Sequence, residues 1–170
     1  HNPHTLELAL EGCADCHTVV ADVEDLKDVR MPSSAVDYDG DGDVEEGIFY
    51  ETQGLQEILY QAIQDYAAEV AGTPIMYDAA SYPYWFTEDE EGYNSWTARL
   101  AKAAYNYQVS IKDPGEFAHG GKYVIQLLYD SIEDLDPDLV ADLKRIDHGH
   151  FAGSEEAFRH WDEDGEVSGS

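Results

Sequence analysis

Apolar residues recur at helical spacing in three stretches of the chain, and this pattern predicts three helices. The first predicted helix covers residues 55–71 and ends at Gly72 and Pro74, which together stop a helix. The second covers about 94–109, with Trp96 and Leu100 among its inward positions, and the third covers about 116–132.

Two shorter helical segments are predicted towards the carboxyl end. Asp136 and Pro137 suit an N-cap and a first helical position, so we expect a short helix from there to about Ile146. Ser154 is a candidate cap for a last turn through Trp161.

Long loops separate the predicted helices. Residues 74–93 are rich in Tyr, Trp, Pro and acidic residues and predict a long ordered loop. Its aromatic side chains suit either an ordinary core or packing against other subunits. Only short runs such as residues 48–50 favour a strand. We therefore expect a mainly α fold, with few helices, long ordered loops and little or no sheet.

The charge of the chain narrows the partners that it can bind. Its 170 residues carry 9 basic and 37 acidic side chains, for a formal net charge of −28. Such a charge disfavours nucleic acid and anionic membrane surfaces as partners, because both repel it. No stretch reaches the roughly 18 apolar residues of a membrane span, so no membrane insertion is expected. No basic and apolar leader opens the chain, and we expect a mature or excised polypeptide.

The two cysteines form a motif with a histidine. Cys13, Cys16 and His17 make a C-x-x-C-H sequence, the attachment signature of a c-type haem. Two thiols add across the vinyl groups of one porphyrin, and the following histidine is then placed to bind the iron. The alternatives are a dithiol redox pair, which would follow a strand of a βαβ unit, and half of a zinc site, which would need scattered histidines as further ligands.

Other short motifs resemble segments of multihaem c-type cytochromes. The opening His1-Asn2-Pro3-His4 is similar to their C-H-N-P-H run. Residues 113–123 are similar to their H-N-x-K-Y element, with Gly120 in place of Asn. Residues 148–151 and 158–161 resemble their ligand-bearing segments. The resemblance implies that the chain is either a single c-type haem domain over residues 1–170 or a segment of a longer multihaem polypeptide.

The resemblance also implies which histidines bind iron. His119 corresponds to a distal ligand and is the favoured partner of His17. A second histidine would hold the reduction potential low, whereas Met31 or Met76, the weaker candidates, would raise it. The other candidate ligands of this or a neighbouring haem are His1, His4, His148, His150 and His160.

An acidic loop at residues 37–48 opens like the calcium loop of an EF-hand. Acidic side chains occupy positions 1, 3 and 5, and Gly42 occupies position 6, where the chain must turn sharply. Position 12 is Ile48 instead of the usual Glu, and Glu46 is its nearest substitute, ahead of Glu45. The alternative is a solvated acidic turn. We expect a structural Ca²⁺ with the ligands Asp37, Asp39, Asp41, Asp43 and Glu46.

Electron transfer is the expected function. A covalent, bis-histidine haem leaves no open iron position, so it would pass electrons to neighbouring haem-bearing subunits or redox partner proteins. The resemblance implies a periplasmic, cell-surface or extracellular location and an oligomer or polymer, such as a calcium-stabilised filament. The alternative is a subunit of a multihaem reductase with an open iron site.

Overall fold

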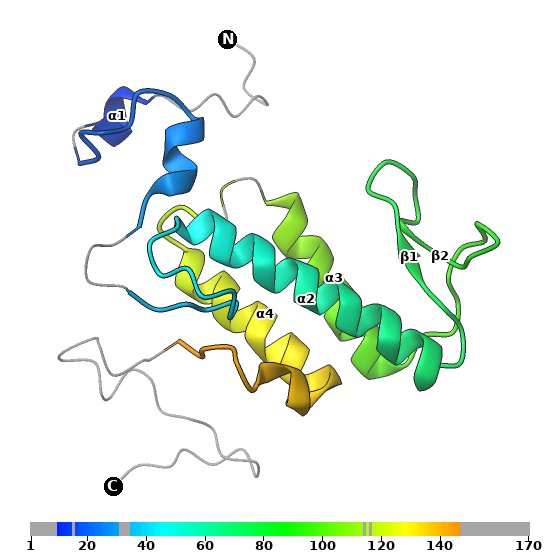
Figure 1. Cartoon of the computed structure of the whole chain (residues 1–170). Coiled ribbons are helices and arrows are strands. Elements are labelled where there is room, and N and C mark those ends of the chain that lie inside the picture. Colours follow the sequence, from blue (N-terminus) through cyan, green and yellow to red (C-terminus); the bar gives the residue numbers. More distant parts are fainter. Residues whose placement is uncertain (1–9, 15, 31–34, 114, 116, 147–170) are drawn as a thin grey trace, which may run out of the picture.

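Three long helices dominate the protein (Figure 1). The structure is a computed structural model that describes residues 10–14, 16–30, 35–113, 115 and 117–146. The long helices are α2 (Ile48–Glu69), α3 (Ala98–Lys112) and α4 (Gly121–Leu135). Shorter elements are α1 (Glu11–Ala14) and the 3₁₀ helices η1 (Glu24–Asp28) and η2 (Pro137–Val140). The prediction of a mainly α fold is confirmed.

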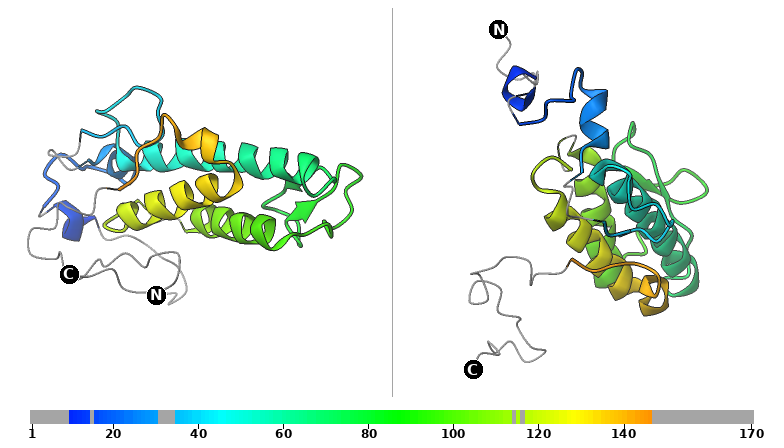
Figure 2. Two further views of the ribbon diagram at one scale, coloured as in Figure 1. Left: turned by 90° about the horizontal axis from the view of Figure 1, so that it is seen from below. Right: turned by 60° about the vertical axis from the view of Figure 1, so that its left-hand side comes forward.

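The helices α2, α3 and α4 form a bundle in which each contacts the other two. Successive helices run in opposite directions, so α2 and α4 both begin at the same end of the bundle (Figures 1 and 2). The turn between α3 and α4 lies at that end, with α1 and η1 beside it. The connection between α2 and α3 lies at the opposite end (Figure 2).

The core follows from the apolar spacing of the three helices. Each helix buries side chains three or four positions apart, which lie on one helical face. Burying one large aliphatic side chain contributes about 1.5–3 kcal/mol, so these contacts hold the bundle together. The large apolar side chains that are fully buried on the three helices are Leu55, Leu59, Ile63, Leu100, Ile125, Leu128 and Ile132.

The first turn of α2 corrects the strand expectation for residues 48–50. These residues are helical, and α2 begins at Ile48 instead of near residue 55. Glu51 and Thr52 are polar but buried, at 0% and 1% exposure, so they interrupt the apolar pattern that marks the rest of the helix. The Thr52 hydroxyl donates to the Ile48 carbonyl at 2.9 Å. Long-range contacts of this turn therefore outweigh its local strand preference.

The other two long helices begin later than their spacing predicted. Helix α3 begins at Ala98 because the Thr97 hydroxyl caps it, accepting from the Leu100 amide at 3.1 Å. Trp96 precedes this cap and is 39% exposed, so the expectation that it points inward was wrong. Helix α4 begins at Gly121 because His119 has a φ of 57°, which ends any right-handed helix there.

The predicted cap at Asp136 is confirmed. Its side chain accepts from the Asp138 amide at 2.9 Å, and Pro137 opens η2. The element ends at Val140 instead of continuing to Ile146. The turn predicted after Ser154 lies outside the described residues.

The loop at residues 74–93 contains a short hairpin. Strands β1 (Met76–Tyr77) and β2 (Trp85–Phe86) pair antiparallel, with Tyr77 opposite Trp85. The Trp85 ring lies 5.8 Å from Tyr107 of α3 and 6.4 Å from Tyr60 of α2, measured between ring centroids. Trp85 is also 5% exposed, so these aromatic residues anchor the hairpin on the bundle.

In the described part of the chain, no helix is both long enough and apolar enough to cross a membrane.

Candidate functional site

The C-x-x-C-H motif lies on a helical turn beside the end of the bundle where α2 and α4 begin (Figure 2). The Cys16 and His17 amides both donate to the Cys13 carbonyl, at 3.1 and 2.8 Å. Positions i, i+3 and i+4 of a helical turn share one face, so both thiols and the imidazole face the same way. Both cysteines are free thiols.

A pocket of about 300 Å³ connects this motif to the turn before α4. This volume is at the lower end of the range for cofactor pockets, about 300–1,000 Å³. Its walls come from the motif, from η1 and its flank, and from Gly115 and residues 117–119, which are far away in sequence. The lining residues are Gly12, Cys13, Cys16, His17, Leu26, Val29, Gly115, Phe117, Ala118 and His119.

His17 and His119 both line this pocket. Their ring centroids are 6.3 Å apart, and their ring planes differ by 29°. Two imidazoles that bind one metal ion from opposite sides, with metal–nitrogen bonds of about 2 Å, have ring centroids roughly 6 Å apart. The spacing of the two rings therefore fits a pair of axial ligands.

The backbone of His119 is held in an unfavourable conformation. Its φ of 57° is left-handed, a region that costs a residue with a Cβ about 1–2 kcal/mol. Strained backbone of this kind concentrates at active sites and ligand clamps. Gly120 and Gly121 follow directly, and α4 starts there, so the bundle fixes the position of the strained residue.

The structure thus brings together one predicted iron-ligand pair, His17 and His119. The candidates His1, His4, His148, His150 and His160 lie outside the described residues, as does Met31. Met76 lies in β1, at the opposite end of the bundle. Sequence reasoning did not select Leu26 and Val29 as pocket walls, since a few apolar residues in a short polar segment give no periodic signal.

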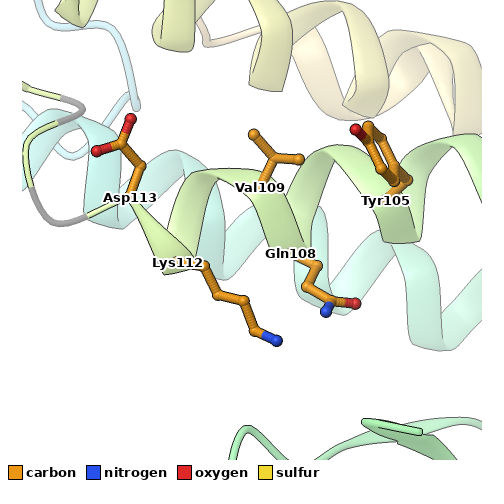
Figure 3. A pocket seen from close by; sticks show the side chains of 5 residues that line it. All are labelled: Tyr105, Gln108, Val109, Lys112 and Asp113. Carbon is orange, nitrogen blue, oxygen red and sulfur yellow. The ribbon is translucent and has the colours of Figure 1, made fainter. Parts of the chain in front are cut away.

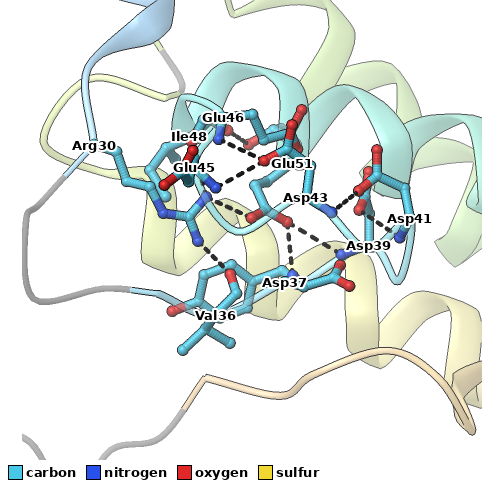
Figure 4. A network of polar contacts seen from close by, with 12 residues as sticks. Arg30, Val36, Asp37, Asp39, Asp41, Asp43, Glu45, Glu46, Ile48 and Glu51 are labelled. Carbon is cyan, nitrogen blue, oxygen red and sulfur yellow. Dashed lines mark hydrogen bonds and ion pairs between the residues drawn. The ribbon is translucent and has the colours of Figure 1, made fainter.

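The acidic loop folds against the first turns of α2 (Figure 4). Two groups of carboxylates each have ligand atoms within 4.8 Å of one another: Asp37, Asp39 and Glu51, and Asp39, Asp41 and Glu46. Four of the five predicted ligands therefore lie close together. Sequence reasoning missed Glu51, because it lies beyond the loop in a helix.

Asp43 and the loop glycines shape the turn. The Asp43 carboxylate accepts from the Glu45 and Glu46 amides, at 2.8 and 3.3 Å, and belongs to neither of the two groups. Gly40 and Gly42 have φ values of 83° and 95°. The Asp37 carboxylate accepts from both of their amides, at 2.6 and 2.9 Å. The predicted sharp turn at Gly42 is therefore present.

Crowding of negative charge disfavours ionisation in this loop. Burial, followed by the charges of Asp41, Glu51 and Asp37, raises the pKa of Asp39 to about 6, although a hydrogen bond from the Asp41 amide opposes the shift. Burial and the neighbouring carboxylates raise the pKa of Glu46 to about 7. The Glu46 Oε1 atom is buried and has no hydrogen-bond partner among the described residues. A bound cation would satisfy this oxygen and offset the repulsion.

Glu51 joins the loop to the rest of the protein. It is fully buried, and its Oε1 accepts from Arg30 Nη1 at 2.5 Å. Its Oε2 accepts from the Tyr38 and Asp39 amides, at 2.6 and 3.2 Å. Arg30 also donates to the carbonyls of Val36 and Glu46. The buried ion pair of Arg30 and Glu51 therefore bonds residues near both ends of the acidic loop and holds these ends together.

Another hollow, on the outer face of α3, has neither the thiol and imidazole groups of the first pocket nor the clustered carboxylates of the acidic loop. It measures about 460 Å³ and is lined by Tyr105, Gln108, Val109, Lys112 and Asp113, all from α3 or its last turn (Figure 3). The Lys112 Nζ lies 3.3 Å from the Tyr84 ring centroid, a cation–π contact between helix and hairpin. We interpret this hollow as a packing feature.

Comparison of the chain with protein-family models, curated proteins and solved structures finds no match.

The replacement Gly54→Ala tests the packing of the acidic loop on α2. A Cβ at this position would lie 1.8 Å from the Asp39 Oδ2 and 2.9 Å from the Asp39 Cβ, so the whole Asp39 side chain must move. Gly→Ala inside a helix normally stabilises by about 0.5–1 kcal/mol. Here we expect a loss of about 1–3 kcal/mol, as in other overpacked sites. Chemical denaturation measures it, with the exposed neighbour Gln53→Ala as the control; a stabilised Gly54→Ala would contradict this packing.

The backbone strain at His119 gives a second prediction. His119→Gly and His119→Ala both remove the imidazole, but only glycine relieves the left-handed φ. We expect the free energy of unfolding of His119→Gly to exceed that of His119→Ala by about 1–2 kcal/mol in chemical denaturation. Equal stability would show that residue 119 does not occupy the left-handed region.

Proposed function

We propose that this protein is an electron-transfer protein with one covalently attached c-type haem in residues 10–146, held by Cys13 and Cys16. In this proposal, His17 is the proximal iron ligand and His119 is the distal one. One observation carries the proposal: the C-x-x-C-H face and His119 line the same pocket, with the two imidazole centroids 6.3 Å apart. A dithiol redox pair does not account for the second imidazole. A zinc site would need the two thiols and both imidazoles to converge on one ion, and in the described part of the chain the ligand groups that converge within 4.8 Å are those of the acidic residues.

The side chains of the pocket have separate roles. A haem bound here supplies one-electron redox chemistry at its iron. Cys13 and Cys16 would hold the macrocycle through thioether bonds, formed when each thiol adds across a vinyl group. His17 and His119 would both bind the iron, which would leave no position for a substrate. Leu26, Val29 and Phe117 give the pocket apolar walls. Such walls limit solvent access and so help to set the reduction potential.

The pocket would leave part of a haem uncovered by the described residues. A porphyrin is larger than the 300 Å³ enclosed by the described residues, so its edge would lie outside these walls. An exposed edge allows a neighbouring haem-bearing subunit or a redox protein to approach. With a net charge of −28, such contacts are favoured with a cationic partner or in the presence of salt. An extracytoplasmic setting, in an oligomer or filament, remains part of the proposal from the family resemblance.

We further propose that the acidic loop binds one Ca²⁺ through oxygens of Asp37, Asp39, Asp41, Glu46 and Glu51. Calcium prefers six to eight oxygen ligands, and carboxylates, carbonyls and water all serve. The two carboxylate groups share Asp39, and the Glu46 Oε1 in one of them is buried and unpartnered among the described residues, which supports the site. Because the loop leads directly into α2, the ion would stabilise the end of the bundle next to the pocket.

The haem proposal predicts one covalent haem and a six-coordinate iron. After expression with a c-type maturation system, we expect an intact mass one haem above that of the polypeptide and a low-spin ferric spectrum. His119→Ala should give a high-spin ferric iron and a ferrous form that binds CO readily, because one axial position is then open. Absorption and EPR spectroscopy check both points.

Matched replacements separate His119 from the other candidate ligands. His148→Ala, His150→Ala and His160→Ala should remain low-spin and fail to bind CO. If one of them opens the iron instead, the distal ligand is misassigned. Ready CO binding by the unaltered protein would favour the reductase alternative, and an absence of added mass would refute the haem proposal.

The calcium proposal predicts a gain in stability. At a free Ca²⁺ concentration about 100 times the Kd, binding to the folded state alone adds about 2.7 kcal/mol. We expect Tm to rise with Ca²⁺ and to return with chelator. Glu46→Gln should raise Tm without Ca²⁺, because it removes a repelled carboxylate, and should reduce the calcium increment. The control Glu45→Gln changes the adjacent residue, which belongs to neither carboxylate group, and should behave like the unaltered protein. An unchanged increment in Glu46→Gln would exclude it as a ligand.

A further inference from the structure

The segment that carries Cys13, Cys16 and His17 has almost no share in the hydrophobic core. Among its described residues, 10–14 and 16–30, none belongs to the buried core cluster or to the side chains packed against it. Helix η1 buries none of its residues. Val20 is buried, at 8% exposure, but lies outside the core cluster. Packing of apolar side chains, which holds the three-helix bundle together, therefore contributes little to the attachment of this segment.

Arg30 attaches the segment to the bundle instead. Its side chain is only 7% exposed, and its partner Glu51 is fully buried. The two terminal nitrogens of its guanidinium bond the Glu51 carboxylate and the carbonyls of Glu46 and Val36. Three acceptors from α2 and the acidic loop thus converge on one side chain at the end of the motif-bearing segment (Figure 4).

The start of α2 lies between the two histidine-bearing segments. On one side, Gly47 packs so tightly on the Lys27 backbone that a Cβ would lie 1.7 Å from its carbonyl oxygen, and the Ile48 amide donates to the Val29 carbonyl at 3.4 Å. On the other side, the Phe49 and Phe117 rings meet edge to face, with centroids 5.3 Å apart. A shift of the motif-bearing segment against α2 therefore changes its position relative to residues 117–119.

We propose that Arg30 is a positioning residue for the iron: its ion pair with Glu51 sets the distance and angle between His17 and His119. This inference rests on the proposed haem function and adds a residue that the C-x-x-C-H motif does not include. The guanidinium suits the task, since its planar fork bonds several acceptors in fixed directions, whereas an ammonium is a compact point charge. Without the fork, the described contacts of the motif-bearing segment with α2 are backbone contacts and exposed side-chain contacts such as Lys27 over the Phe49 ring, at 4.9 Å. The alignment of His119 with the iron would then be lost.

The test compares Arg30→Lys with a matched control in the haem-loaded protein. Arg99→Met is the control, because Arg99 also pairs with a carboxylate, at 3.4 Å, but is 53% exposed and lies on α3. CO binding to the ferrous protein measures how readily His119 is displaced. We expect Arg30→Lys to bind CO about tenfold more tightly than the unaltered protein, within the range usual for coupling between two sites. Its reduction potential and EPR signal should shift as well, and Arg99→Met should change none of the three.

A double replacement separates positioning from a general contribution to stability. Glu51→Gln keeps an oxygen that can accept from the Tyr38 and Asp39 amides and removes the buried negative charge. Arg30→Met with Glu51→Gln therefore leaves no buried charge unpaired and is expected to stay folded, as far-UV circular dichroism can check. We expect the Tm of this double variant to be close to that of the unaltered protein. We expect it still to bind CO more tightly than Arg99→Met does. If CO affinity and potential in both Arg30 variants equal those of the control, the inference is overturned. Absence of covalent haem in the unaltered protein would instead refute the proposed function, so the two failures are distinguishable.

Discussion

The buried pair of Arg30 and Glu51 is the contact that joins the motif-bearing segment, the acidic loop and α2. Burying two charges is costly, and removing one partner of such a pair typically costs about 3–5 kcal/mol. Here the charges are compensated by amides of the acidic loop on Glu51 and by loop carbonyls on Arg30. The same atoms thereby close the loop and attach the preceding segment to α2. Ion pairing and hydrogen bonds hold the segments together at this end, whereas apolar packing holds the helices of the bundle together.

The bundle topology explains why the two sites are neighbours. Since α2 and α4 begin at the same end, the acidic loop before α2 and the turn before α4 both lie at that end (Figure 2). The opposite end is closed by the aromatic hairpin, whose Trp85 packs on α2 and α3. A rigid, apolar end thus supports a polar end built from loops. A covalent haem and a bound cation would add to that polar end the stability that its own side chains do not supply.

Local features of the fold were predictable from sequence, and longer-range ones were not. Helical periodicity located all three long helices, and the Asp136 cap followed from two adjacent residues. The start of α2 was missed, because Glu51 and Thr52 are buried for reasons that lie elsewhere in the chain. The late start of α4 was missed as well, because a left-handed φ at a histidine has no strong sequence signal.

The features of the candidate sites also divide into those that local sequence predicts and those that depend on long-range contacts. The shared face of Cys13, Cys16 and His17 and the sharp turn at Gly42 come from interactions within one or two turns of chain, which the sequence encodes directly. The family resemblance proposed His119 as a partner, but its distance and angle to His17 depend on the bundle that brings the two segments together. Only the tertiary structure added Glu51 to the acidic loop and Arg30 to Glu51. A buried charge is tolerated only where distant residues satisfy it, and no local pattern records which residues those are.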